Sequence, residues 1–349
     1  MAFAVTGGGC DPAESTEDTP EEPFTPSVEA LSMPAGCEEC VIAAVRGTSD
    51  NDVYFAGYQK SVGGAVMLRW DGQSLVEVAL PDNRPQLLGN ISASGPNDVW
   101  ALPALTSDLT PGPDVVHWDG NTWTSMDVVA GQVDSVMELS LAAIAPGDAW
   151  LFVAAGAVAA YHWDGISWTE RPEVPLTPGA YHVTSWAGAP DDIWVAYDDV
   201  DGDGNYAPSQ AVVLHFDGSE WSVVMKDEGF SLRGLFGTDT GEPLLATWNG
   251  VYTWKNGAFE PLGAEETDGC VEGALGDRTR ISARSLHDIW AMQSDARGEV
   301  SADTYVAHWD GTAWECAMMT REDNFAGLWM GSEQGWLAGS TVARLSAEK

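Results

Sequence analysis

A short acidic segment has the spacing of a calcium-binding loop. Asp199, Asp201 and Asp203 alternate with other residues and are followed by Gly204 and Asn205. Ca²⁺ takes six to eight oxygen ligands, and this D-x-D-x-D-G spacing supplies three carboxylates with a glycine at the sharp turn. The sequence therefore predicts a Ca²⁺ site formed by Asp199, Asp201, Asp203 and Asn205. The alternative is an acidic, glycine-containing loop that holds no ion.

Arginine is scarce in this chain, and four arginines share one kind of position. Arg46, Arg233, Arg280 and Arg284 fall on or beside short apolar segments that we expect to form the innermost strands of a circular fold. Guanidinium groups that converge on one channel bind carboxylates through paired hydrogen bonds. We therefore consider an anion site in the channel. The alternative is that these arginines form salt bridges with the chain's own carboxylates.

The histidines suggest acid–base chemistry, but their pattern favours a structural role. Four of the six precede an Asp-Gly dipeptide, and antiparallel pairing would place each beside an aspartate. The expected pairs are Asp98 with His117, Asp148 with His162, Asp192 with His215, and Asp288 with His308; Arg69 replaces the histidine opposite Asp52. A further copy lacks both partners, with Thr253 at the histidine position. Because the aspartate and the histidine are present together in four copies and absent together in one, we interpret them as hydrogen-bonded structural pairs rather than catalytic dyads.

Four cysteines remain when Cys10 near the N-terminus is set aside. An even number of cysteines in an exported domain suggests disulfides. We favour Cys37–Cys40, which are three residues apart, and Cys270–Cys316. A zinc site with four thiolates is the alternative, although the chain has no second C-x-x-C motif.

These residues belong to an internal repeat. One phrase is H-W-D-G-x-x-W, as in residues 117–123 and 308–314, with a degraded copy at residues 253–259. The other phrase is Asp, a small or aliphatic residue, then an aromatic, as in residues 98–100. The phrases recur about every 47 residues. Such a period, with several short apolar strands and a tight turn in each unit, is typical of β-propeller blades.

The repeat also predicts the order of strands within a blade. Asp-Gly between apolar runs is a hairpin signal, because both central residues of a type I′ turn need a positive φ. We place this dipeptide between the third and fourth strands, and the Asp-aliphatic-aromatic phrase at the start of the second. The segment before that phrase, such as residues 281–283, is then the innermost strand. The sequence predicts an all-β, seven-bladed β-propeller of four-stranded blades over residues 27–349.

The last repeat unit, at residues 325–349, is too short to contain a fourth strand. Residues 27–31 have the same pattern as residues 74–78, the expected outer strand of the first blade. We therefore expect residues 27–33 to provide the outer strand of the last blade. An N-terminal outer strand would close the ring and leave no blade interface unpaired.

Most of the 17 tryptophans occupy repeat positions, where we expect them to pack blades together. The exceptions are Trp186, Trp248 and Trp329. These three are candidates for an exposed surface that stacks on a ligand.

Residues 1–26 differ in character from the rest of the chain. Small residues precede Cys10, and residues 11–22 are acidic and proline-containing, a composition that cannot pack a core. A cysteine in this setting resembles the start of a bacterial lipoprotein. The resemblance implies export, lipidation of Cys10 and a disordered acidic tether. The alternative is an exported N-terminus without a lipid.

The charge balance excludes some partners. The chain has 53 Asp and Glu against 15 Lys and Arg, a formal net charge of −38. Such a surface repels nucleic-acid phosphates and anionic lipids. No apolar run approaches the roughly 20 residues that span a bilayer. We therefore expect no nucleic-acid partner, and membrane contact only through the lipid anchor.

Across about residues 41–345, the alternation of V-W-A with H-W-D-G-x-x-W resembles tectonin-type propeller repeats and the tandem propeller lipoproteins of marine and predatory bacteria. Tectonins bind sugars and lipopolysaccharide. The resemblance implies a non-enzymatic extracytoplasmic binding or adhesion module for a glycan or protein ligand, at the outer membrane, the cell surface or in the periplasm. The acidic loop at residues 199–205 predicts that Ca²⁺ stabilises this module. One alternative is a glycan-active hydrolase or lyase, which needs an acid–base pair beside the channel arginines. The other is a structural or scaffold lipoprotein.

Overall fold

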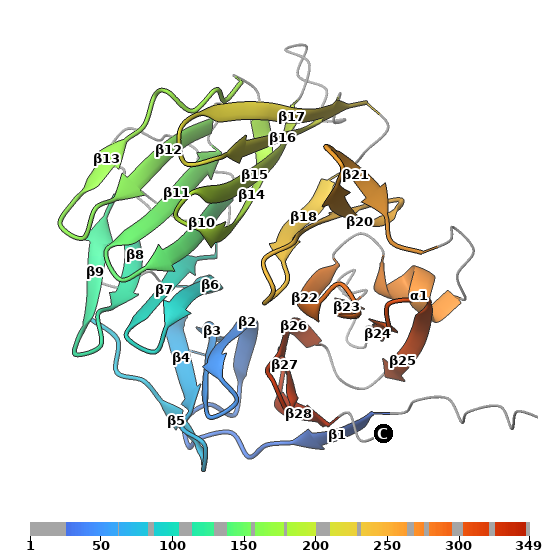
Figure 1. The fold of residues 1–349 in the computed structure, drawn as a ribbon. Helices are drawn as coiled ribbons and strands as arrows, with labels where there is room; N and C mark the ends of the chain where they lie inside the picture. Colours follow the sequence, from blue (N-terminus) through green and yellow to red (C-terminus); the bar gives the residue numbers. More distant parts are fainter. Residues whose placement is uncertain are drawn as a thin grey trace, which may run out of the picture.

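Each of the seven repeat units forms one four-stranded antiparallel sheet, and the sheets are arranged in a ring (Figure 1). The computed structural model describes residues 26–346, except for residue 62 and residues 83–86, 105–113, 129–137, 155–157, 178–179, 200–209, 229–231, 264–268, 276–278, 295–302 and 321–324. The all-β, seven-bladed propeller predicted from the repeat is confirmed. No helix in this part of the chain is long and apolar enough to cross a membrane.

The first four blades follow one another along the chain, each in the order inner to outer strand. Blade 1 contains β2 (Cys40–Ser49), β3 (Asp52–Gln59), β4 (Gly64–Trp70) and β5 (Leu75–Glu77). Blade 2 contains β6 (Leu88–Gly95), β7 (Asp98–Pro103), β8 (Asp114–Trp118) and β9 (Trp123–Asp127). Blade 3 contains β10 (Glu138–Ala145), β11 (Asp148–Ala154), β12 (Val158–Trp163) and β13 (Trp168–Glu170). Blade 4 contains β14 (Ala180–Ala189), β15 (Asp192–Asp199), β16 (Gln210–Phe216) and β17 (Trp221–Asp227).

The last three blades include one helix and the closure of the ring. Blade 5 contains β18 (Leu232–Gly237), β19 (Pro243–Thr247), β20 (Gly250–Lys255) and β21 (Ala258–Pro261). Helix α1 (Gly269–Ala274) comes before blade 6 and packs on its β24 and β25. Blade 6 contains β22 (Arg280–Ser285), β23 (Asp288–Ser294), β24 (Thr304–Trp309) and β25 (Trp314–Thr320). Blade 7 contains β26 (Phe325–Met330), β27 (Gly335–Gly339), β28 (Val342–Ser346) and β1 (Ser27–Ala30).

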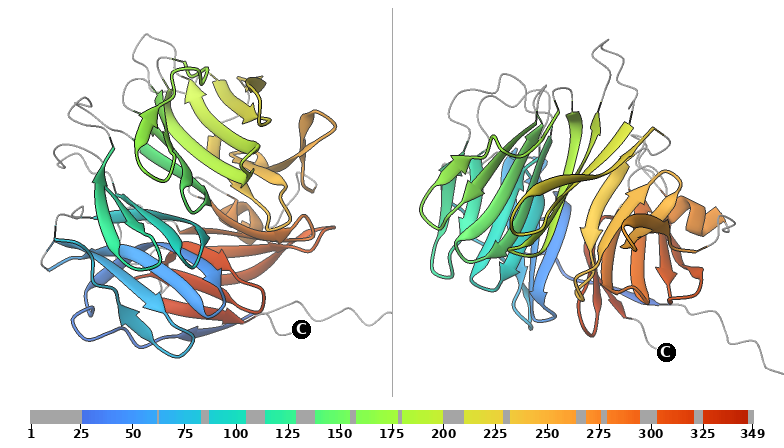
Figure 2. Two further views of the ribbon diagram at one scale, coloured as in Figure 1. Left: turned by 60° about the vertical axis from the view of Figure 1, so that its left-hand side comes forward. Right: turned by 45° about the horizontal axis from the view of Figure 1, so that its top comes forward.

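The N-terminal strand closes the ring, as predicted. β1 pairs antiparallel with β28, from Ser27 opposite Ser346 to Ala30 opposite Ala343. Leu31 extends the pairing by donating its N–H to the Val342 carbonyl at 2.8 Å. Figure 2 shows β1 beside the C-terminal strands, so the two ends of the described chain meet in one blade.

The Asp-Gly turns lie where the sequence places them, but their geometry differs from the expected type I′. Only the glycine has a positive φ, 90° at Gly72. The carboxylate of Asp71 instead accepts the backbone N–H groups of Gln73 and Ser74, at 2.9 and 2.8 Å. This capping favours a four-residue connection between the paired Trp70 and Leu75.

The degraded repeat copy in blade 5 has the type I′ geometry that the sequence predicts for the Asp-Gly turns. Asn256 and Gly257 have φ values of 51° and 86°, and Asn256 is the only non-glycine residue of the described chain with a positive φ. Lys255 pairs directly with Ala258, so the loop has two residues. Loss of the capping aspartate therefore accompanies a change to the tighter hairpin.

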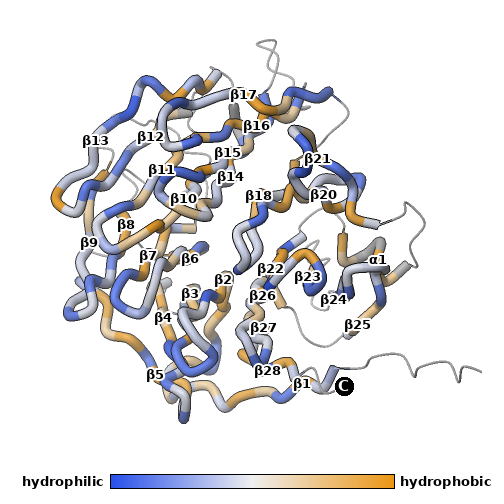
Figure 3. Tube along the Cα trace, viewed as in Figure 1, coloured by the Kyte–Doolittle hydropathy of each residue, from blue (hydrophilic) through white to orange (hydrophobic). Residues whose placement is uncertain are grey.

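The hydrophobic core lies between consecutive blades rather than in one central cluster. Trp100 of blade 2 is fully buried, and its ring meets Trp163 and Trp168 of blade 3 edge-on, with centroids 5.9 and 5.5 Å apart. Figure 3 shows hydrophobic and hydrophilic residues alternating in short stretches along the strands. Successive side chains of a strand point to opposite faces of its sheet, so a strand that is buried along most of its length, such as β3, packs against both neighbouring blades.

The repeated strand order gives the ring two distinct faces. All seven innermost strands begin at one face, which we call the start face. The hairpins between first and second strands and the Asp-Gly turns lie at the opposite face, which we call the turn face. Equivalent positions in different blades therefore lie at the same height along the central axis.

Candidate functional site at the central channel

The repeated aspartates and histidines form the predicted pairs, all at the turn face. The histidine Nε2 lies 2.7–3.0 Å from the aspartate Oδ1 in the pairs Asp98–His117, Asp148–His162, Asp192–His215 and Asp288–His308. In blade 1, Arg69 Nε donates to Asp52 at 2.6 Å. These contacts link the second and third strands of each blade.

The surroundings of Asp98 show why such pairs are structural. Its carboxylate also accepts the indole N–H of Trp100 at 2.9 Å and the hydroxyl of Ser94 at 2.5 Å. Asp98 is fully buried, and the His117 ring stacks on Trp100 with centroids 3.6 Å apart. A carboxylate with three protein donors and no exposed surface has no room for a substrate, so the pair satisfies buried polar groups.

A cavity of about 260 Å³ lies in the central channel and is lined by the innermost strands of all seven blades. Three of the four candidate arginines, Arg46, Arg233 and Arg280, line it. Glu138 and His182 line it too. These two belong to no repeated phrase and lie near the starts of β10 and β14, so they line the channel at its start-face end.

Glu138, His182 and Asp198 form a chain of titratable groups across blades 3 and 4. His182 Nε2 lies 3.5 Å from Glu138 Oε1, and His182 Nδ1 lies 3.7 Å from Asp198 Oδ2. Backbone amides hold both carboxylates, because Val183 N donates to Glu138 at 3.1 Å and Leu232 N to Asp198 at 3.4 Å. The imidazole therefore lies between two carboxylates that backbone amides hold in place.

This environment shifts two pKa values. Burial disfavours the His182 imidazolium, but the nearby carboxylates of Asp198 and Glu138 outweigh it and raise the pKa of His182. Burial also raises the pKa of Glu138, against the opposing charges of His182 and Arg280. Both groups therefore retain protons at a higher pH than they would in water.

Two arginines complete the start-face end of the channel. Arg280 lies close enough to Glu138, and Arg233 close enough to His182, to influence their pKa values. The Arg233 guanidinium also lies over the Trp248 ring, 4.8 Å from its centroid. Trp248 is 59% exposed, in the turn between β19 and β20. Of the three tryptophans outside the repeat, Trp248 is thus the one that presents a ring to solvent.

The other two candidate arginines lie near acidic residues closer to the turn face. Arg284 Nη1 donates to Asp288 at 2.8 Å. Arg46 and Arg284 lie near Asp239, since both lower its pKa while burial raises it. For Arg284 the structure therefore supports the salt-bridge interpretation. The four arginines do not form one cluster but divide between the two ends of the channel.

Trp186 and Trp329 pack against the neighbouring blade. A Cβ on Gly47 would lie 2.2 Å from the Trp329 ring, and one on Gly237 would lie 1.8 Å from the Trp186 ring. Trp329 lines the channel but is only 8% exposed, so the expectation of an exposed ring is wrong there. The missing side chains of the two glycines make these close approaches possible.

The calcium prediction falls mostly outside the described residues. Asp199 ends β15 and pairs with Gln210 at the start of β16, on the start face of blade 4. Asp201, Asp203 and Asn205 lie outside the described part of the chain. No cluster of three or more possible metal-binding side chains occurs among the residues that are described.

The cysteines pair as favoured from the sequence, and Cys10 lies outside the described residues. One disulfide joins Cys37 to Cys40 before blade 1, and the other joins Cys270 of α1 to Cys316 of β25. The four-thiolate alternative is therefore not what the structure shows. Two disulfides indicate an oxidising, extracytoplasmic environment.

Sequence reasoning missed the group formed by Glu138, His182 and Asp198. One signal was available, because His182 is one of only two histidines outside the repeated phrase. Its two carboxylate neighbours could not be identified, since they come from a different blade and a different strand. Glu138 and His182 can exchange hydrogen bonds with a ligand, and the guanidinium groups of Arg233 and Arg280 lie beside them. This arrangement can hold a ligand that carries both an anionic group and hydroxyl groups.

Comparison with known proteins establishes the fold alone. No protein-family profile matches the chain, and no curated protein sequence matches it. Among solved structures, YCF48 bound to D1 peptide is 13% identical with a TM-score of 0.56, over 93% of this chain and 96% of that one. The WD40 propeller of Doa1 is 12% identical with a TM-score of 0.57, over 93% and 98%. The fucose-specific lectin from Aleuria aurantia is 17% identical with a TM-score of 0.50, over 86% and 97%.

Proposed function

We propose that this protein is a non-enzymatic, extracytoplasmic binding module that holds a carboxylate-bearing ligand at the start-face end of its channel. The observation that carries the proposal is that Arg233 and Arg280 line one cavity with Glu138 and His182. In a chain with a formal net charge of −38, a small cavity lined by three arginines, two of them at its start-face end, is a local exception. Guanidinium pairs recognise carboxylates specifically.

The ligand that fits best is an acidic glycan. The exposed Trp248 ring beside Arg233 offers an apolar face for a sugar ring, next to a cation for its carboxylate. Glu138 and His182 can form hydrogen bonds with the hydroxyl groups of the sugar. A fucose-specific lectin among the similar folds shows that propellers can bind sugars, and a peptide-bound neighbour makes an acidic protein segment the other ligand class.

Calorimetric titration with trigalacturonate tests this proposal, with neutral galactotriose and an acidic peptide as comparison ligands. Arg233→Gln and Arg280→Gln should each weaken trigalacturonate binding by about tenfold, the loss expected for one charge-assisted hydrogen bond. Arg284→Gln is the control: Arg284 pairs with Asp288 nearer the turn face, so this change should leave trigalacturonate binding unchanged. Binding of the acidic peptide alone would assign the site to protein ligands. Equal binding of the neutral and acidic sugars would contradict the role of the arginines.

A hydrolase or lyase is the second candidate, because the channel contains the acid–base pair that such an enzyme needs. Glu138 and His182 both have raised pKa values beside two arginines. Prolonged incubation with polygalacturonate distinguishes the two functions. New reducing ends or unsaturated products that disappear in Glu138→Gln would assign catalysis. If no sugar or peptide is bound, a structural or scaffold role remains.

We also propose that the loop from Asp199 through Asp201, Asp203 and Asn205 binds a stabilising Ca²⁺ ion at the start face. The spacing of the carboxylates and the position of Asp199 at the end of β15 support it. Ca²⁺ should raise the melting temperature of the wild type, and Asp201→Asn should abolish the rise. A rise of the same size in Asp201→Asn would remove the proposal.

The proposed location is the outer membrane, the cell surface or the periplasm, with the chain held by a lipid on Cys10. The two disulfides support export, and the acidic segment after Cys10 supports a tether. After expression in a bacterial host, the wild type should fractionate with membranes and Cys10→Ser with the soluble periplasmic proteins. Identical fractionation of the two would contradict lipidation.

A further inference from the structure

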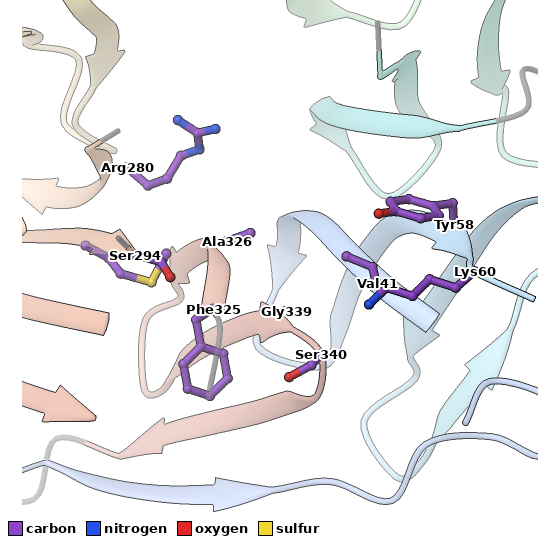
Figure 4. A pocket seen from close by; sticks show the side chains of 10 residues that line it. Val41, Tyr58, Lys60, Arg280, Ser294, Phe325, Ala326, Gly339 and Ser340 are labelled. Atoms are coloured by element: carbon purple, nitrogen blue, oxygen red, sulfur yellow. The ribbon is translucent and has the colours of Figure 1, made fainter. Parts of the chain in front are cut away.

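A second cavity opens beside the channel on the start face, between blades 6, 7 and 1 (Figure 4). Its volume is about 330 Å³. Ends of several strands meet there, among them β3 with Tyr58, β23 with Ser294 and β26 with Phe325. It touches the channel cavity at Arg280, which lines both, but is otherwise built from different residues.

The charge of this second cavity is opposite to that of the chain as a whole. Lys60 and Arg280 line it, and none of the described residues that line it is a carboxylate. Figure 4 shows the Tyr58 hydroxyl and the Lys60 ammonium directed from blade 1 into the gap, toward blades 6 and 7. With 53 acidic residues against 15 basic ones, a pocket with two cations and no lining acid favours an anion.

A buried polar group provides an independent indication of a ligand. The hydroxyl of Ser294 is buried and has no hydrogen-bond partner among the described residues. Ser294 lines the cavity on the side opposite Lys60 (Figure 4). A buried hydroxyl without a partner costs about 1–3 kcal/mol, so a ligand toward which the Ser294 side chain rotates gains affinity by bonding to it.

The remaining lining of the second cavity is largely apolar. Phe325 and Met292 are each 1% exposed, and Val41 contributes an aliphatic wall. Cations at the rim and apolar side chains within suit a ligand with a charged head and a hydrophobic body. A hydrated inorganic anion would leave the apolar part unfilled.

We propose that the second cavity binds an organic carboxylate with an aromatic or branched aliphatic body. The ligand's carboxylate lies between Lys60 and Arg280 and accepts a hydrogen bond from Ser294. Its hydrophobic body lies on Val41 and Phe325. This site shares Arg280 with the acidic-glycan site but is otherwise built from different residues. Lys60 belongs to this cavity alone and Arg233 to the channel cavity alone.

Ligand-observed ¹⁹F NMR with 4-fluorophenylacetate tests the proposal on the full chain. We expect saturable binding, with at least tenfold weaker binding of the neutral 4-fluorophenylacetamide, which has the body without the charge. Unlabelled phenylacetate should displace the probe, and acetate, which has the charge without the body, should not. Equal binding of the acid and the amide, or no binding of the acid, would overturn the proposal.

Variants locate the site and separate it from the channel. Lys60→Met should weaken 4-fluorophenylacetate binding by about tenfold, and Ser294→Ala should weaken it by about threefold or more. Arg233→Gln should leave this binding unchanged while it weakens trigalacturonate binding. Lys60→Met is at an exposed position and Ser294→Ala removes one atom, so both should fold; far-UV circular dichroism checks this. If neither variant weakens binding, the probe is bound elsewhere and the assignment is wrong.

Discussion

His117 Nε2 donates to the buried carboxylate of Asp98 at 2.7 Å, and this pair recurs with little change in three other blades. All copies lie at the turn face, whereas Glu138, His182 and Arg280 lie near the start face. The fold and the candidate function are thus carried by different residues at opposite ends of the same strands. The repeated residues can be varied to test stability, and the others to test binding.

The Asp98 pair should matter more to stability than its copy at Asp148. Asp98→Ala leaves the donors of His117, Trp100 and Ser94 without their acceptor in a site with no exposure, which should cost about 3 kcal/mol of unfolding free energy. The Asp148 side chain is 30% exposed, so water can replace it and Asp148→Ala should cost about 1 kcal/mol. Urea denaturation measures both losses. Equal losses would show that burial does not set the strength of the pair.

The sequence was sufficient for the fold because each blade repeats the same local constraints. The phrase around Asp98 begins a second strand and the phrase around His117 ends a third, so their spacing defines a blade. The turn geometry was not predictable from Asp-Gly alone, since the carboxylate of Asp71 caps two backbone amides and replaces the type I′ conformation.

The candidate site was only partly predictable, because it depends on contacts between blades. Arg233 and Arg280 were identifiable from their place on innermost strands. The contacts that join Glu138 and Asp198 to His182 depend on how blades 3 and 4 are placed against each other, which no local pattern encodes. Burial of Trp329 likewise depends on the absence of a side chain at Gly47 in another blade.

The two disulfides should differ in their contribution to stability. Cys270 and Cys316 are 46 residues apart, whereas Cys37 and Cys40 are three apart. Restriction of the unfolded chain grows with loop length, to about 4 kcal/mol for the longer loop and about 2 kcal/mol for the shorter one. The double variant Cys270→Ser, Cys316→Ser should therefore melt at a lower temperature than Cys37→Ser, Cys40→Ser. The reverse order would indicate that native contacts near Cys37, rather than loop length, dominate.

Close packing of Trp186 on Gly237 should make this glycine intolerant of substitution. A Cβ at Gly237 would lie 1.8 Å from the indole, so Gly237→Ala must displace the ring and should cost about 1–3 kcal/mol. At Gly64 a Cβ would meet no atom within 4 Å, and the residue has no positive φ, so Gly64→Ala is the matched control and should be nearly neutral. Thermal denaturation compares the two. A neutral Gly237→Ala would mean that Trp186 is free to move and is available to a ligand after all.

The raised pKa of His182 predicts that its contribution to stability depends on pH. Glu138 and Asp198 favour the imidazolium more in the folded chain than water does in the unfolded one, and Arg233 opposes them. A group whose pKa is raised on folding contributes fully below its unfolded pKa, about 6.5 for histidine, and loses that contribution as pH rises through the folded pKa. The stability difference between the wild type and His182→Gln should therefore be largest at or below pH 6.5 and should shrink above it.

Urea denaturation of both proteins at intervals from pH 5.5 to 9 measures this difference, and NMR titration of the His182 ring gives the folded pKa directly. Protonated His182 also adds positive charge beside Arg233 and Arg280. Binding of trigalacturonate should accordingly weaken as pH rises through the same range, and His182→Gln should remove most of that dependence. A stability gap that grows with pH would mean that burial, rather than the two carboxylates, controls the imidazole, and the channel would then be a poorer anion site at low pH than proposed.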